Sequence, residues 1–449
     1  MQSHSRDQCS TNIPVVRLTN VLCLLVLSLI IGSVLIPRFQ FLNRSIGTDD
    51  LLCVPLVLLM PVIVFKEQTS VVTKLYVWFL LIIFTCLFSL IYGDYLFMGS
   101  ISAPTEVHQY IKRFIFFGVT IECLKNIRNQ ETLRRIIILF SVIFIASMAV
   151  AILQIMGIEA MINLYSRGIE HTTLAQRQVG LSRTIGIAGI SIGWGGFCIL
   201  MLVHFAALSF VGRGLIALGY SVIAGLASVL ATMTFSKSTV IALMFVLGLL
   251  SYLYITQPWE GPRAVNKLKR TGFVLIALII VIAVVIHQID NGHLTFLYRR
   301  MSVGLPIIGQ QALTENLRYQ EVIAALSGFK EEPLAFLFGL GKTYARARSG
   351  HVEVEFFYVL TAYGLIGVLL RYGLMWHFVK QSWKMMRNER NYQLRYIAIV
   401  MFTATLAYLV FTIGFFFWQE IVVGTTYWIF AGIFWGMKCN KYRVVKSQC

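Results

Sequence analysis

The chain has 449 residues, of which 57% are hydrophobic and 13% are charged, and its mean hydropathy is +0.76. This small number of polar side chains cannot cover the surface of a water-soluble globule, and these values therefore exclude a soluble protein. They indicate a protein that crosses a membrane several times. Most of the formal net charge of +18 comes from short loops between apolar segments, where membrane topology and anionic lipids explain it without nucleic acid as a partner.

Twelve apolar stretches are long enough, or nearly long enough, to cross a bilayer as helices, because about 20 helical residues span about 30 Å of hydrocarbon. They cover residues 18–36, 50–65, 75–93, 110–124, 133–156, 184–210, 214–232, 238–255, 272–289, 353–378, 395–417 and 420–437. The sequence therefore predicts an all-α polytopic membrane protein. The stretch at 110–124 is short, and an interfacial or re-entrant helix is an alternative for it.

The distribution of Lys and Arg predicts the orientation of these helices, because short loops that carry them stay in the cytoplasm. Loops rich in Lys and Arg fall on one predicted side of the membrane, whereas the loop at 93–109, on the other side, contains neither residue. Both termini are therefore predicted to be cytoplasmic. The chain then divides into nine helices in residues 1–287, a large external loop at 288–352, and three helices with a basic tail at 353–449.

Several basic residues nevertheless fall on the predicted external side. Arg183 precedes one apolar stretch, and Lys237 lies in the short turn before another. The large loop adds Arg299, Arg300, Arg318, Lys330, Lys342, Arg346 and Arg348. Cations close to a membrane are costly unless they have partners, so we expect them to bind an anionic ligand; a solvated basic surface is the alternative.

The segment RTIGIAGISIGWGGFCIL (183–200) is rich in glycine. Small residues allow helices to approach closely, which is the structural interpretation of this segment. The functional alternative is a helix that begins directly after Arg183 and presents its free N–H groups to an anion.

Two motifs in the large loop combine charge with a defined backbone. TENLRYQEVIAAL (314–326) predicts an amphipathic helix with Thr314 as its N-cap and Arg318 in its first turn. FGLGKTYARARSG (338–350) predicts a turn whose backbone could simply reverse the chain or bind an anion.

His351, Glu353 and Glu355 follow that turn and lead into an apolar stretch. One of them could act as a general base or hold the hydroxyl group of an acceptor. Helix capping is the alternative role for the two glutamates, and exposure at the membrane interface is the alternative for His351.

These motifs resemble the bacterial O-antigen ligase and polymerase superfamily of membrane glycosyltransferases. The likeness lies in FSKSTVIALMFVLGLL (235–250), ENLRYQEVIAAL, FGLGKTYA and HVEVEFFYVLTAYGLIGVLL, in that order around a large external loop, and it covers about residues 183–372. The resemblance implies a GT-C-like membrane fold. It also implies transfer of sugars from an undecaprenyl-pyrophosphate-linked oligosaccharide at the periplasmic face of the bacterial inner membrane.

The resemblance also implies roles for individual residues. Lys237 and Arg318 match positions that hold the pyrophosphate, and His351 matches a position that serves the acceptor; Glu353 is the alternative for that role. The further candidates for pyrophosphate binding are Arg183, Arg299 and Arg300. An inverting transfer that uses no metal ion or other cofactor is expected.

One departure from the ligase pattern favours a polymerase that joins lipid-linked repeat units: VEVEFF follows His351 in place of an Asn-containing run. A second departure is Lys237, which replaces an arginine and cannot make the bidentate contact of a guanidinium group to the pyrophosphate. The expected partners are the lipid-linked donor, membrane lipids and a chain-length regulator protein. A ligase that transfers finished polymer to the lipid A core remains the alternative, because it shares the donor and the fold.

A flippase or transporter of the same lipid-linked sugars is the alternative from a different class of protein. Transporters tend to show internal repeats and ionisable groups near the middle of the membrane. The sequence shows no internal repeat, and among the candidate charged residues only Arg371 falls well inside an apolar stretch. We interpret Arg371 as either part of a buried pair or a side chain that reaches from a lipid-facing position to the membrane surface.

Overall fold

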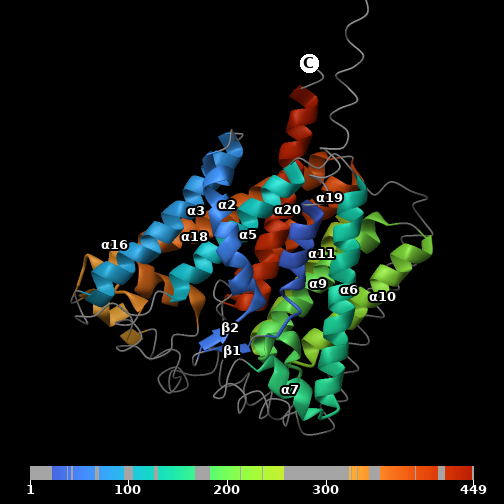
Figure 1. Cartoon of the computed structure of the whole chain (residues 1–449), viewed down its shortest axis with the longest axis horizontal. Coiled ribbons are helices and arrows are strands. Elements are labelled where there is room, and N and C mark those ends of the chain that lie inside the picture. The colour runs from blue at the N-terminus through green and yellow to red at the C-terminus, as the bar shows by residue number, and fades with distance from the viewer. Residues whose placement is uncertain are drawn as a thin grey trace, which may run out of the picture.

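The computed structural model shows a bundle of long helices with one short β-hairpin at one end (Figure 1). The residues that it describes are 23–37, 39–41, 44–65, 70–95, 105–125, 130–166, 183–212, 214–234, 236–256, 323–324, 326–330, 332–342, 354–389, 391–412 and 420–446. In the hairpin, β1 (Phe39–Phe41) pairs antiparallel with β2 (Arg44–Ile46). The hairpin lies at the end of the bundle opposite the C-terminus, and we call this end the hairpin end (Figure 1).

Ten helices in the described part of the chain have 18 residues or more. They are α2 (Thr48–Phe65), α3 (Ser70–Ser89), α5 (Thr105–Lys125), α6 (Gln130–Ile155), α9 (Ser191–Val211), α10 (Gly214–Thr232), α11 (Lys237–Thr256), α18 (Glu355–Asn388), α19 (Tyr392–Phe411) and α20 (Ile421–Lys446). The shorter elements are a helix at Cys23–Gly32, the π-helix η1 (Leu90–Tyr95), α7 (Glu159–Tyr165), the 3-10 helix η2 (Gly186–Ala188) and α16 (Ala335–Phe338).

Within the described residues, eight helices are long and apolar enough to cross a membrane. The described part of the chain is thus all-α apart from one small hairpin, consistent with a multi-pass membrane protein. The helix α10 begins and ends where the sequence predicts, whereas α18 continues ten residues beyond the predicted end at residue 378. The predicted helix at 272–289 and most of the predicted large loop lie outside the described residues.

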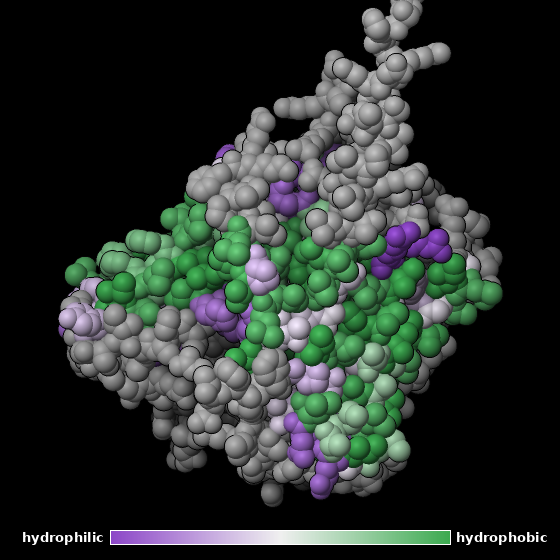
Figure 2. All heavy atoms as spheres, in the orientation of Figure 1, coloured by the Kyte–Doolittle hydropathy of each residue, from purple (hydrophilic) through white to green (hydrophobic). Residues whose placement is uncertain are grey.

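The helices divide into a buried centre and an outer layer. In the most apolar part of α9, 94% of the residues are buried, compared with 33% in α6. The outer helices direct Leu, Ile, Val and Phe side chains outward, and apolar residues cover much of the coloured surface (Figure 2). Such a surface suits lipid, because lipid tails replace water around it.

The helix α5 lies in the centre of the bundle although it carries several charges. It packs against α2, α3 and α20. Glycines of α20 allow this close approach: a Cβ at Gly432 would lie 2.6 Å from Cβ of Thr120, and one at Gly436 would lie 2.8 Å from Cβ of Leu124. The interfacial alternative for residues 110–124 is therefore wrong, because an interfacial helix would expose one face.

The glycine-rich segment before and within α9 has the structural role expected of small residues. A Cβ at Gly195 would lie 3.0 Å from Cβ of Thr239 in α11, and one at Gly196 would lie 3.1 Å from Val423 in α20. The alternative of a helix start directly after Arg183 is wrong, because residues 183–185 are not helical and α9 begins at Ser191.

Candidate functional site

Buried polar side chains gather at the hairpin end, where α5 meets α2, α18 and α20. Glu106, Tyr110 and Arg113 follow one another at intervals of four and three residues, so they share one face of α5. All three are buried, with exposed fractions of 7%, 1% and 1%. Charged groups in this position need partners, because burial removes their hydration.

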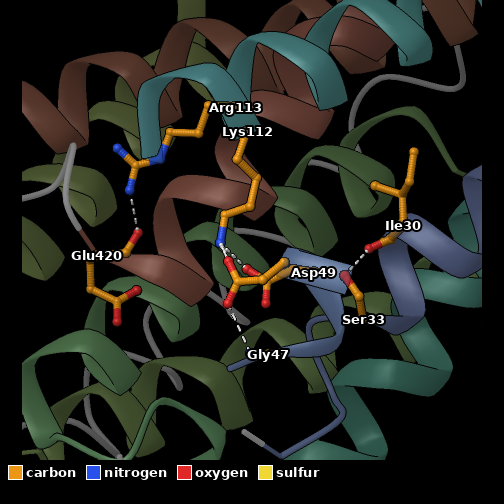
Figure 3. Close-up of polar contacts among 8 residues, drawn as sticks. Ile30, Ser33, Gly47, Asp49, Lys112, Arg113 and Glu420 are labelled. Atoms are coloured by element: carbon orange, nitrogen blue, oxygen red, sulfur yellow. Dashed lines mark hydrogen bonds and ion pairs between the residues drawn. The ribbon is translucent and has the colours of Figure 1, made fainter. Parts of the chain in front are cut away.

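Lys112 forms an ion pair with two carboxylates at the beginning of α2 (Figure 3). Its ammonium group contacts Asp49 and lies 2.6 Å from Oδ1 of Asp50. The other oxygen of Asp50 accepts a hydrogen bond of 2.8 Å from the backbone N–H of Gly47, which caps the helix. Lys112 thus joins α5 to the beginning of α2 through both carboxylates.

Arg113 lies against the first turn of α20 (Figure 3). Its Nη2 donates a hydrogen bond of 3.0 Å to the carbonyl oxygen of Glu420. The absence of a side chain at Gly424 makes room for the guanidinium group, because a Cβ there would lie 2.9 Å from Nη2. The carboxylate of Glu420 accepts the backbone N–H of Val423 at 2.7 Å and so caps α20.

The Nε and Nη1 atoms of Arg113 are buried without a hydrogen-bond partner among the described residues. Leaving such N–H groups unsatisfied costs about 1–3 kcal/mol each, and more for a charged group. Buried donors of this kind in native proteins call for an explanation, and a ligand oxygen is one. Arg113 is therefore a candidate residue for binding an anion or a hydroxyl group.

Glu106 connects α5 to α18 and to the FGLGK segment. Its Oε1 accepts a hydrogen bond of 2.5 Å from the hydroxyl of Tyr358 and lies 3.3 Å from the ammonium group of Lys342. Lys342 is 29% exposed, while Glu106 is almost completely covered. This pair holds the end of the FGLGK segment against the bundle and leaves one basic side chain partly accessible.

Arg371 is buried between two tyrosine rings. Its guanidinium carbon lies 4.6 Å from the centre of the Tyr110 ring and 4.2 Å from that of Tyr363, and its Nη2 donates to the Sγ atom of Cys86 at 3.2 Å. Cation–π contacts are stronger where water is excluded. The side chain thus belongs to the interior, and the lipid-facing interpretation of Arg371 is wrong.

The helix α18 is interrupted at Gly364, next to this arginine. Gly364 has φ +68° and ψ −175°, values that end the helical geometry and that favour glycine. The FGLG segment packs into the interruption, where the N–H of Leu340 donates to the carbonyl of Thr361 at 2.8 Å. Ser89, at the end of α3, donates to the carbonyl of Ala362. Interrupted helices are common at the binding sites of membrane proteins, because the freed backbone groups need partners.

The structure places two of the predicted anion-binding residues on neighbouring segments. The N–H of Thr184 donates to the carbonyl of Met233 at 3.1 Å, so the half-buried Arg183 lies beside the turn between α10 and α11. Lys237 is the first residue of α11, directly after that turn. The side chain of Lys237 and the residues Arg299, Arg300, Arg318, His351 and Glu353 lie outside what the structure describes.

The helix α18 begins at a buried carboxylate. Glu355, the first residue of α18, is 1% exposed, and its N–H donates to the carbonyl of Thr412 at 3.1 Å. His351 and Glu353 precede it by four and two residues. Those two residues lie outside the described part of the chain, which resumes at Val354.

Sequence reasoning missed Glu106, Lys112 and Arg113 as candidate functional residues. The sequence does contain a signal for two of them, because YIKRF places the Lys112–Arg113 pair within an apolar stretch predicted to lie in the membrane. Ionisable residues inside such a stretch face the protein interior or a cavity and mark functional sites. Their partners in α2 and α20 could not be identified from spacing, because they lie far away along the chain.

The arrangement combines cations, carboxylates and tyrosine hydroxyls in a part of the molecule that excludes water. Such preorganised groups can stabilise a negative charge that develops during a reaction, or orient a hydroxyl group. Neither a scan against protein-family models nor a search of curated proteins finds a match for this chain, so similarity assigns it to no family.

Proposed function

We propose that the chain is a membrane glycosyltransferase that polymerises a surface polysaccharide. It joins undecaprenyl-pyrophosphate-linked repeat units at the periplasmic face of the bacterial inner membrane. The observation that supports this best is the buried Arg113, whose Nε and Nη1 have no hydrogen-bond partner among the described residues. A pyrophosphate leaving group needs donors of this kind in a site without water.

In the proposed reaction one glycosidic bond forms and one sugar–phosphate bond breaks, and both cations and a base can assist this exchange. The hydroxyl oxygen of the acceptor attacks the anomeric carbon, and the bond from that carbon to the pyrophosphate oxygen breaks with its electron pair. The pyrophosphate leaves with added negative charge, which Arg183, Lys237, Arg318 and Arg113 stabilise. His351 or Glu353 takes the proton of the acceptor hydroxyl.

The distribution of basic residues supports a periplasmic location for the hairpin end. Lys125 ends α5 and Arg387 lies in the last turn of α18, both at the end of the bundle where the C-terminus lies. Basic residues next to membrane helices favour the cytoplasmic side. The hairpin end then faces the periplasm, where undecaprenyl-linked repeat units are joined.

The lipopolysaccharide of a strain that lacks this chain tests the proposal. Lipid A core with a single repeat unit is the expected result, because ligation continues when polymerisation fails. Bare core with polymer accumulating on the lipid carrier would instead identify a ligase. Bare core without repeat units outside the cytoplasm would identify a transporter.

Reconstitution provides a test that does not depend on the other proteins of the cell. Purified protein in liposomes, supplied with the strain's own lipid-linked repeat units, should produce a ladder of longer oligosaccharides. Intact donor without any longer product would contradict the proposed function.

A further inference from the structure

Three lysines gather at the end of the bundle opposite the hairpin, where α18 and α20 are in contact. Lys380 and Lys384 are exposed and lie four residues apart on α18, so they share one face of that helix. Lys438, on α20, is half-buried. Two neighbouring helices thus contribute positive charge to the same end of the bundle.

The ammonium group of Lys438 is held between the two helices. Its Nζ donates a hydrogen bond of 2.7 Å to Oε1 of Gln381 on α18. It also lies 4.5 Å from the centre of the Trp435 ring on α20, an arrangement in which the aromatic face attracts the cation. His377 of α18 packs against the same ring, with planes 2° apart and ring centres separated by 5.6 Å. These contacts fix the position of the positive charge.

In the part of the chain that the structure describes, none of the three lysines forms an ion pair with a carboxylate. The charges that act on this place are instead of the same sign. Lys384 is close enough to repel Lys438, and both Lys438 and Lys380 act on His377. Repulsion between like charges grows where burial removes water. An anion between the lysines would relieve it.

The buried indole of Trp435 offers a further hydrogen-bond donor. Trp435 is fully buried, and its Nε1 has no hydrogen-bond partner among the described residues. The neighbouring indole of Trp78, which packs against His377, donates to the carbonyl of Leu370 at 2.8 Å. Buried N–H groups without a partner are rare in native proteins and call for an explanation. The surroundings of Lys438 therefore combine unpaired positive charge with an unused donor.

The lysines lie at the level where the helices leave the membrane. The apolar part of α20 ends at Asn440, two residues after Lys438. On α18, the exposed Trp376 and Leu369 precede Lys380 by four and eleven residues, which places them on the same side of the helix. Exposed tryptophan is typical of the membrane interface. An apolar stripe thus continues from the lysines toward the membrane centre, as an amphipathic ligand requires.

We infer that Lys380, Lys384 and Lys438 form a binding site for the phosphate headgroup of an anionic phospholipid, whose tails lie along α18. Basic residues place this end of the bundle in the cytoplasm, so the lipid belongs to the inner leaflet, which carries anionic lipids. Membrane topology alone requires lysines here, but not one that is held over a buried indole between two helices. The inference does not depend on the proposed reaction.

Native mass spectrometry of the purified full-length protein in detergent tests this inference. The probes are phosphatidylglycerol and cardiolipin, which are anionic, and phosphatidylcholine, which has no net charge. The ratio of lipid-bound to lipid-free protein gives an apparent dissociation constant for each. The anionic lipids should bind at least about tenfold more tightly than phosphatidylcholine, because three basic residues attract their charge.

Variants of the lysines assign the binding to this place. Lys438→Gln should weaken binding of the anionic lipids roughly fivefold, whereas Lys438→Arg should stay within about twofold of the wild type. Lys384→Gln should also weaken binding roughly fivefold, and its exposed position makes an effect on folding small. Arg134→Gln is the matched control, because it removes one positive charge from an exposed position on α6. It should bind lipid as the wild type does.

Three results would overturn the inference. They are equal binding of anionic and uncharged lipids, wild-type binding by Lys384→Gln and Lys438→Gln, and equal weakening by Arg134→Gln, which would indicate an unspecific effect of charge. Thermal unfolding with inorganic phosphate distinguishes a lipid from a free anion. Phosphatidylglycerol should raise the unfolding temperature, and phosphate at the same concentration should not. Equal stabilisation by phosphate that Lys438→Gln abolishes would identify a site for free anions and contradict a lipid site.

Discussion

Gly339 and Gly364 lie in contact with one another, both with positive φ angles, of +88° and +68°. A Cβ on Gly364 would lie 2.6 Å from the backbone nitrogen of Gly339, and one on Gly339 would lie 2.6 Å from Cα of Tyr363. This contact joins the FGLGK segment to the interruption of α18. It also places Lys342 beside Glu106.

Replacement of Gly364 by alanine should therefore destabilise the protein. The added Cβ collides with backbone atoms that cannot move independently, and a positive φ costs alanine about 1–2 kcal/mol more than glycine. Size-exclusion chromatography of the fluorescently tagged variant in detergent should show a reduced fraction of folded protein. Gly248→Ala in α11 is the control, because a Cβ there meets no atom within 4 Å. Equal yields for the two variants would argue against a tight contact at Gly364.

The ion pair of Lys112 with Asp49 and Asp50 predicts a large effect on stability. Lys112→Met removes the ammonium group from the buried Asp49 and the partly buried Asp50, which we expect to cost about 3–5 kcal/mol of unfolding free energy. Thermal unfolding of the purified protein measures the loss. Lys74→Met, at an exposed position of α3, should unfold like the wild type. If Lys112→Met did so too, the carboxylates would have another partner.

Arg113 should affect activity through the shape of its side chain as well as its charge. Arg113→Lys keeps the charge but loses the planar arrangement of donors, so a second contact to a phosphate group is lost. Synthesis of polymer should fall at least about tenfold, with the folded fraction unchanged. Arg134→Lys, at an exposed position on α6, is the matched control. Normal polymer from Arg113→Lys would remove Arg113 from the anion site.

The base of the proposed reaction can be identified by comparing two variants. His351→Ala should stop polymer synthesis if the imidazole takes the proton of the acceptor, whereas Glu353→Gln should stop it if the carboxylate does. Membrane extracts from strains that carry each variant, analysed on lipopolysaccharide gels, distinguish these outcomes. Full activity of both variants would place the base elsewhere in the chain.

The sequence is sufficient to predict the apolar helices, but it does not predict which residues form the polar interior. The helix α10 could be predicted to the residue because its apolar run begins and ends abruptly. The central position of α5 in the bundle could not be predicted, because it depends on glycines in α20 more than 300 residues later in the chain. Periodicity describes one helix at a time and says little about which helices pack together.

The interruption of α18 shows a second limit of sequence reasoning. TAYGLIGVLL (361–370) is apolar and predicts a continuous helix, because a glycine inside a helix costs only about 1 kcal/mol. The backbone turns at Gly364 because the FGLG segment supplies donors for the carbonyls of Thr361 and Ala362. The motif was recognised from the sequence as a turn, but its partner could not be predicted.

The burial of Lys112 and Arg113 affects how the chain is inserted into the membrane during synthesis. A helix with both residues near its middle is poorly accepted by the bilayer, since each charge costs about 2.5–3.5 kcal/mol at the centre of a membrane helix. The carboxylates that pair with Lys112 belong to α2, which the ribosome completes first. The hydrogen-bond acceptor of Arg113 is the carbonyl of Glu420, directly before α20, which is synthesised long after α5. Retention of α5 in the nascent protein thus depends on α2 at first, and the surroundings of Arg113 are completed only when α20 arrives.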